Sequence, residues 1–274
     1  MEYLLSTAFD QLSSYDPSAI RRGLRHIEGL LAHICRPNSS ASPKKSSSGV
    51  DNRVTNDPAY EEFLRLQDGF EWNIALRLVS CLERLLGQDQ NELTTLLILS
   101  TLDLLQGVLL VHPPSRHVFA REINMTILLD MLEPQSSTPS IQGATVSTLV
   151  CALVEEWSNV RTFEALDGLS SICALFRRKD TDKEVKLKVL EFLFCYLMPE
   201  LESSQTESPQ LGRRSSESGS DDSKASKTSI SSNGSTDKLR TTQEKQKLLG
   251  RYLNNVDSLV KELRNSRPFG NLDI

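Results

Sequence analysis

The side chains best suited to metal binding or nucleophilic chemistry are four histidines and five cysteines in a chain of 274 residues. A protein metal site usually shows ligands at short, regular spacing, such as HExxH on one helix or paired CxxC motifs. Neither pattern occurs among His26, His33, His112, His117, Cys35, Cys81, Cys151, Cys173 and Cys195. We therefore predict no metal site, and we interpret His26 and His33 as ordinary helix-surface or half-buried residues.

Phosphoryl transfer is the second chemistry to consider. A cysteine phosphatase needs a thiolate at a fixed short spacing before an arginine, in a loop that cradles phosphate. The nearest approach is Cys173 with Arg177 and Arg178, which has the wrong spacing and lies inside a predicted helix. The chain also lacks a GxxxxGK[ST] loop and a GxGxxG motif after a strand. The sequence thus predicts no catalytic residue, no cofactor and no small-molecule substrate.

The cysteines also indicate a compartment. They are odd in number, far apart and mostly embedded in apolar runs, which is typical of buried free thiols in a reducing environment. The N-terminus lacks a basic flank followed by an apolar signal core, and no apolar run reaches about 18 uninterrupted residues. We expect a cytoplasmic or nuclear protein without disulfides or membrane insertion.

The candidate partner-binding residues are polar or aromatic side chains close to an apolar helix face. They are Asp103, Glu155, Glu156, Trp157, Glu191 and Tyr252. Asp103, Ser147 and Glu191 recur at equivalent positions of three helices, off the apolar stripe, and could line a groove. The alternative is that these charges only face water, as most charged residues on such helices do.

Two serines fit kinase consensus patterns. Ser42 is followed by a proline and two lysines, as in cyclin-dependent kinase sites, and Ser216 follows Arg213 and Arg214, as basophilic kinases prefer. Both lie in Ser-rich segments, where an added charge of about −2 could tune the docking of a nearby helix. Such short motifs also arise by chance in Ser-rich sequence.

The elements that position these residues are repeated helices. Residues 115–132 and 159–176 show the same apolar pattern 44 residues apart, and the register continues into the helices that follow. The matching apolar positions are Leu97, Ile141 and Val185; Leu102, Val146 and Leu190; Leu105, Leu149 and Leu193; and Leu109, Leu153 and Leu197. Their spacing returns to one face at 3.6 residues per turn, and a period of about 40 to 47 residues is typical of armadillo and HEAT units. We predict an all-α, armadillo/HEAT-like right-handed α-solenoid.

Around this repeat region the chain divides by composition. Residues 1–35 predict N-terminal helices, 36–56 a disordered loop, 57–200 the armadillo-like repeats, and 201–238 a disordered Ser-rich linker. Within the repeats, Gly69 predicts a break before a helix over 70–86, and a very apolar helix is predicted over 91–111.

The last segment, 239–274, contains a predicted amphipathic helix over 241–264 with net positive charge. Its apolar face needs a surface to pack on. We expect it to dock on the solenoid as a C-terminal cap, because solenoid ends otherwise expose apolar surface. The alternative is a partner-binding or dimerising helix.

Charge is distributed unevenly along the chain. The net charge is −5, but residues 58–200 alone carry 12 basic and 20 acidic side chains. An acidic body repels phosphate backbones, so nucleic-acid binding is not expected, whereas a basic face on a partner would be attracted. The alternative is that the charge only keeps the protein soluble.

Three stretches carry a family resemblance: residues 68–73 (DGFEWN), 102–107 (LDLLQG) with 112–116 (HPPSR), and 159–164 (NVRTFE). Together they resemble the cell division control protein 14 family of the fungal septation initiation network. The similarity extends over most of residues 1–200 and over 249–270. It implies a non-catalytic partner of a germinal-centre-class Ser/Thr kinase that acts at spindle pole bodies to trigger septum formation and cytokinesis. The unrelated phosphatase of the same name is excluded by the missing cysteine loop.

Three functions follow as hypotheses: the kinase-binding adaptor, a general armadillo-type peptide or cargo adaptor, and an enzyme on a helical scaffold. Nuclear import receptors hold basic peptides on a ladder of Asn and Trp, and this chain has only Trp72 and Trp157. An enzyme would need clustered titratable groups, which the sequence does not show.

Overall fold

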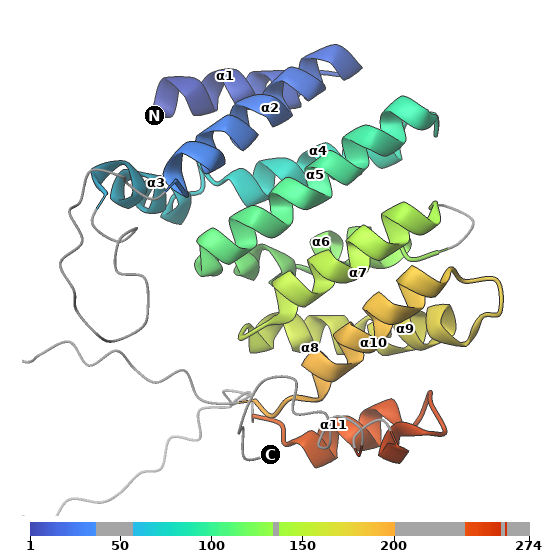
Figure 1. The fold of residues 1–274 in the computed structure, drawn as a ribbon. Helices are drawn as coiled ribbons and strands as arrows, with labels where there is room; N and C mark the ends of the chain where they lie inside the picture. Colours follow the sequence, from blue (N-terminus) through green and yellow to red (C-terminus); the bar gives the residue numbers. More distant parts are fainter. Residues whose placement is uncertain (37–56, 134–136, 201–238, 259–260, 262–274) are drawn as a thin grey trace, which may run out of the picture.

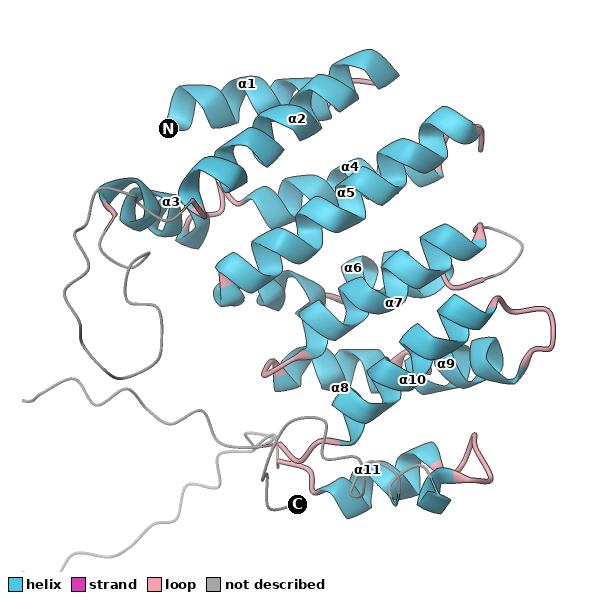
Figure 2. Cartoon of the chain, in the orientation of Figure 1, coloured by secondary structure: helices cyan, strands magenta, loops and turns pink. Residues whose placement is uncertain are grey.

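The computed structural model describes residues 1–36, 57–133, 137–200, 239–258 and 261. These residues form helices, turns and loops without a strand, which confirms the predicted all-α class (Figure 2). The helices are α1 (Glu2–Leu12), α2 (Pro17–Ile34), α3 (Pro58–Asp68), α4 (Ile74–Leu86), α5 (Glu92–Val111), the 3₁₀ helix η1 (Pro113–Ala120), α6 (Glu122–Asp130), α7 (Pro139–Leu153), α8 (Trp157–Ala165), α9 (Gly168–Arg177), α10 (Lys183–Leu197) and α11 (Thr242–Leu249). The proposed loop 36–56 and linker 201–238 lie almost wholly outside the described residues.

Helix starts follow the capping chemistry of the sequence. Asp16 and Asp57 each accept hydrogen bonds from backbone N–H groups of the first turn, with proline at the first helical position. The helix expected over 70–86 begins later, at Ile74, because the Asn73 side chain accepts a hydrogen bond from the Leu76 N–H at 3.0 Å.

The helices are stacked in two layers (Figure 1). In the front layer, α2, α5, α7 and α10 lie side by side, each in contact with the next. Behind them, α1, α4 and α9 pack against α2, α5 and α10 respectively, and α6 contacts α4. The apolar stripe predicted for α5, α7 and α10 is buried between the layers at every position except Leu190, which is half-buried.

Helix α5 is long and apolar enough to cross a membrane by length and composition, and it is the one such helix in the described ranges. It lies between α2 and α7 and packs on α4 and η1, so a central place in the stack accounts for much of its composition. Leu93, Leu96 and Leu110 nevertheless remain exposed. A surface helix normally shows polar residues on its outer face, and α5 shows leucine there.

The C-terminal segment differs from the single helix expected over 241–264. Helix α11 ends at Leu249, turns occupy 250–255, and helical backbone resumes at Val256. Gly250, Asn254 and Asn255 favour the interruption, because glycine and asparagine are poor helix formers. Leu249 and Val256 are both buried, so the turn returns the chain to the apolar surface on which α11 rests.

Candidate functional site

The most highly charged contact in the described structure joins the end of the stack to the C-terminal segment. We call it the C-terminal junction and define it by Arg161 and Glu164 of α8, Glu200 after α10, Arg240, and Lys245 of α11. Arg161 donates through both terminal nitrogens to Glu200, and Lys245 Nζ lies 3.2 Å from Glu200 Oε1. Arg240 pairs with Glu164, which also accepts from Arg161 at 3.4 Å. The five charges therefore alternate in sign across the contact.

Two of these charges are removed from water. The Glu200 side chain is 0% exposed and that of Lys245 is 2% exposed. Lys245 Nζ also donates to the Met198 carbonyl at 3.0 Å and lies over the rings of Trp157 and Tyr196, at 5.4 and 5.3 Å from their centroids. A buried ammonium needs such partners, because an isolated charge in an apolar surrounding costs several kcal/mol.

The environment shifts the pKa values of this pair in the same direction for different reasons. Burial lowers the pKa of Lys245, and Glu200 opposes that effect only in part. Burial alone would raise the pKa of Glu200, but the Arg161 hydrogen bond, the Arg240 N–H and the Lys245 charge outweigh it and hold the pKa below its usual range. The carboxylate therefore stays ionised at neutral pH.

Tyr196 extends the cluster. Its Oη donates to Glu164 Oε1 at 2.7 Å. Burial, followed by the adjacent Glu164 charge and this hydrogen bond, raises the pKa of the phenol far above its ordinary value. Tyr196 thus acts as a neutral donor at all physiological pH values.

The junction also brings together the two ends of the Ser-rich linker 201–238, which is called the Ser-rich insertion below. The Glu200 N–H donates to the Arg240 carbonyl at 3.1 Å, and the Arg240 N–H donates to Glu200 Oε2 at 2.8 Å. The chain therefore leaves the stack and returns to it at one point, although 39 residues separate the two in sequence.

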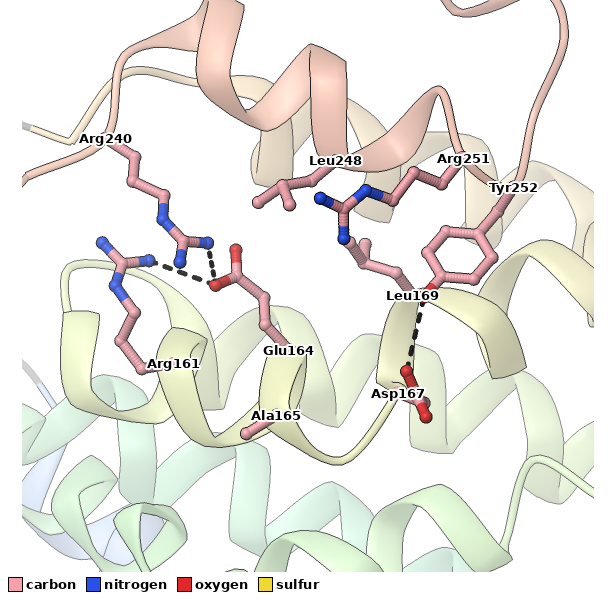
Figure 3. Close-up of a pocket in the computed structure, with 9 residues that line it drawn as sticks. All are labelled: Arg161, Glu164, Ala165, Asp167, Leu169, Arg240, Leu248, Arg251 and Tyr252. Atoms are coloured by element: carbon pink, nitrogen blue, oxygen red, sulfur yellow. Dashed lines mark hydrogen bonds and ion pairs between the residues drawn. The ribbon is translucent and has the colours of Figure 1, made fainter.

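A pocket of about 410 Å³ opens beside the junction (Figure 3). Its lining residues are Arg161, Glu164, Ala165, Asp167, Leu169, Arg240, Leu248, Arg251 and Tyr252. Tyr252 points toward α9 and donates to Asp167 Oδ1 at 3.3 Å, so the pocket is bridged at both ends by contacts between α8–α9 and the C-terminal segment. Within the described ranges, no group of three or more His, Cys, Asp or Glu side chains is placed to hold a metal ion.

The structure brings two of the six predicted partner-binding residues to this junction. Trp157 lies under Lys245, and Tyr252 lines the pocket. Glu155 and Glu156 lie instead at the turn before α8. There Glu155 is 3.6 Å from Arg116, and Glu156 is 3.8 Å from His117.

Asp103 and Glu191 take no part in the junction and lie on α5 and α10. Both are exposed, and by helical spacing they share their sides of these helices with the exposed Leu96, Leu110 and Leu187. We call these five residues the front-layer face. Between them on α7, Ser147 accepts a hydrogen bond from Lys188 of α10 at 2.9 Å. The candidate phosphorylation sites Ser42 and Ser216 lie outside the described residues.

The sequence interpretation missed Glu200, Arg161 and Lys245. One signal was available: Lys245 lies four residues before Leu249 and therefore on the apolar face of α11, where a lysine requires a buried partner. Nothing in the local pattern identifies that partner, because Glu200 is 45 residues away.

Two residues in the stretches that carried the family resemblance, His112 and Asn159, form hydrogen bonds between helices. His112 links Ser115 and Asp68, at 2.8 and 3.1 Å. Asn159 Nδ2 donates to the carbonyls of Arg116 and Ala152, at 2.7 and 2.6 Å. These contacts join α3 to the start of η1, and α8 to η1 and α7.

The fold and the site define an all-α protein of stacked helices whose C-terminal segment is held by buried ion pairs. A family model described as Cell division control protein 14, SIN component, matches residues 1–269. The chain is also 30% identical over 282 residues to Cell division control protein 14 of Schizosaccharomyces pombe (strain 972 / ATCC 24843), an alignment that covers 100% of this chain and 98% of that protein. No solved structure matches.

The chain belongs to the Cell division control protein 14 family of septation initiation network components. This membership confirms the resemblance found in the sequence and assigns the protein a role in cell division. The family description names a network component rather than an enzyme, and a network component acts through contacts with other proteins.

Proposed function

We propose that this protein is a non-catalytic adaptor that binds a germinal-centre-class Ser/Thr kinase, and that it promotes septum formation and cytokinesis from the spindle pole body. Membership in the septation initiation network supports the process. The observation that carries the binding role is the front-layer face, where Leu96, Leu110 and Leu187 are exposed beside Asp103 and Glu191. Exposed apolar side chains with charged neighbours are the usual composition of a protein-binding surface.

The proposed architecture is an armadillo/HEAT-like right-handed solenoid. It is supported by the repeated order of one short helix, one medium helix and one long helix in η1–α6–α7 and again in α8–α9–α10. Such stacks present an extended surface without needing to move, so little conformational entropy is lost when a kinase docks. The C-terminal segment would then serve as the cap of the last unit.

A general peptide-binding adaptor unrelated to septation is the second candidate. Its best-known form uses exposed tryptophans, and here both tryptophans are occupied. Trp72 is stacked on Phe9 with ring centroids 6.2 Å apart, and Trp157 lies under Lys245. We therefore favour the kinase adaptor.

The test is affinity purification of the tagged full-length protein from dividing cells. Recovery of a germinal-centre-class kinase in near-stoichiometric amount is expected, and absence of any such kinase would contradict the proposal. A matched pair of variants then locates the surface. Asp103→Lys with Glu191→Lys should weaken kinase binding by about tenfold or more, because reversed charges repel a basic partner surface. Glu122→Lys with Asp130→Lys makes the same charge change on exposed positions of α6 in the rear layer and should leave binding unchanged.

A further inference from the structure

Phe70 is the exposed phenylalanine among the residues that the structure describes. Its relative exposure is 74%, whereas every other phenylalanine in the described ranges is buried or half-buried. It lies in the short connection between α3 and α4. Since a ring in this position adds almost nothing to the core, stability does not explain a phenylalanine here.

The connection that carries Phe70 is held from inside by a glutamine and an asparagine. Gln67 Nε2 donates to the Trp72 carbonyl at 3.0 Å, and Gln67 Oε1 accepts from the Ile74 N–H at 2.8 Å. Asn73 Nδ2 donates to the Gln67 carbonyl at 2.8 Å. Gln67 is itself 1% exposed, so these bonds are shielded from water.

Three further contacts tie the same connection to neighbouring elements. The Asp68 carboxylate accepts a hydrogen bond from His112 Nε2 at 3.1 Å. The Trp72 ring stacks on Phe9 of α1. The Arg77 guanidinium donates to the Glu71 carbonyl at 3.3 Å and lies over the Phe9 ring. The residues on both sides of Phe70 are thus fixed by contacts to His112, which lies between α5 and η1, and to α1 and α4.

A rigid connection that displays one aromatic ring is a preorganised binding element. Interface energy concentrates in a few aromatic or arginine anchors that fill a pocket on the partner. An anchor on a fixed backbone loses little conformational entropy on binding. The neighbouring Asp68 and Glu71 are both exposed, so the ring is presented between two acidic side chains.

We propose that Phe70 is an anchor residue for the kinase partner, and that it inserts into an apolar pocket of the kinase whose rim carries lysine or arginine side chains. This inference rests on the proposed kinase-binding function and adds a specific contact to it. The acidic pair Asp68 and Glu71 supplies the charge complementarity that selects a basic rim.

The test measures the dissociation constant between the purified full-length protein and the purified kinase recovered with it. Phe70→Ala should weaken binding by about tenfold or more, which corresponds to about 1.4 kcal/mol. Phe70→Trp keeps an aromatic anchor and should retain most of the affinity. Tyr15→Ala is the matched control, because Tyr15 is also an aromatic with 74% exposure but lies in the turn between α1 and α2.

The thermal midpoint of all three variants should equal that of the wild-type protein, since neither ring is part of the core. The inference is overturned if the wild-type protein binds the kinase and Phe70→Ala binds equally well, or if Tyr15→Ala weakens binding as much as Phe70→Ala. Failure of the wild-type protein to bind any germinal-centre-class kinase would overturn the proposed function and this contact together.

Discussion

At the scale of single residues, Glu200 is the side chain on which the C-terminal junction depends. It is fully buried and contacts Arg161, Lys245 and the Arg240 backbone. Neutralising one member of a buried charge cluster leaves the others unpaired, which typically costs about 3–5 kcal/mol. Glu200→Gln should therefore lower the local free energy of unfolding of α10 and α11 by about 3–5 kcal/mol. Native-state hydrogen exchange of the two helices measures this change. Asp180→Asn, which breaks an exposed pair with Arg178, should leave the free energy of unfolding nearly unchanged, because solvent screens such a pair.

The same carboxylate makes the junction sensitive to acid. The pKa of Glu200 is lower in the folded state than in the unfolded state, so the ionised carboxylate stabilises the fold. This contribution to stability is fully present above the unfolded-state pKa of about 4.3, and it is lost as the pH falls through the folded-state pKa. Below about pH 4, acid should therefore lower the protection of the α11 amides against hydrogen exchange in the wild-type protein, measured relative to their intrinsic exchange rates. Glu200→Gln should show no such component, and an unchanged acid dependence in this variant would assign the effect to another group.

The cysteines allow a residue-scale test of packing. Burial raises the pKa of Cys81 and Cys173 to about 11, so both remain neutral thiols and poor nucleophiles at pH 8. Cys35 is exposed. A thiol reagent such as DTNB should thus react fast with the exposed Cys35, while Cys81 and Cys173 react only after unfolding in guanidinium. Labelling of Cys81 or Cys173 in the absence of guanidinium would show that the interior is open.

At the scale of elements, the contact between α8 and α9 requires a glycine at position 168. A Cβ on Gly168 would lie 2.3 Å from the Phe163 ring, and that ring is fully buried against Phe192 and cannot move aside. Gly168→Ala should lower the unfolding free energy by about 1–3 kcal/mol through overpacking. Gly29→Ala is the matched control, because nothing lies within 4 Å of its Cβ position in α2. There alanine should stabilise by about 0.5–1 kcal/mol, as measured by urea denaturation.

The bounds of helix α5 were predicted from the sequence, whereas the exposure of its leucines was not. Its bounds agree closely with the expected 91–111, because asparagine before the helix and prolines after it are strong local signals. Its outward leucines could not be assigned from the sequence. A helix that is apolar all round is normally buried, and only the positions of α2, α4 and α7 show which leucines remain uncovered.

At the scale of the whole molecule, the Ser-rich insertion leaves and rejoins the stack at one place. Glu200 and Arg240 are hydrogen-bonded to each other, so a short connection can replace residues 202–238 without moving either end. Replacement by about six Gly and Ser residues should leave the thermal midpoint unchanged or slightly raised, because closing a shorter loop costs less entropy. A loss of helical circular dichroism or a fall of more than a few degrees would mean that the insertion itself supports the fold.

The sequence by itself determined the all-α class, the bounds of α5, the shared apolar stripe of α5, α7 and α10, and the family. These features are local or periodic, since caps act within one turn and a buried face repeats every 3.6 residues. Only the tertiary structure decided that Lys245 meets Glu200, that Trp157 lies beneath Lys245, that the C-terminal helix is interrupted after Leu249, and that Phe70 faces solvent. Ion pairs between distant residues leave no periodic trace in the sequence, and the exposure of a side chain depends on which neighbours the rest of the chain brings to it.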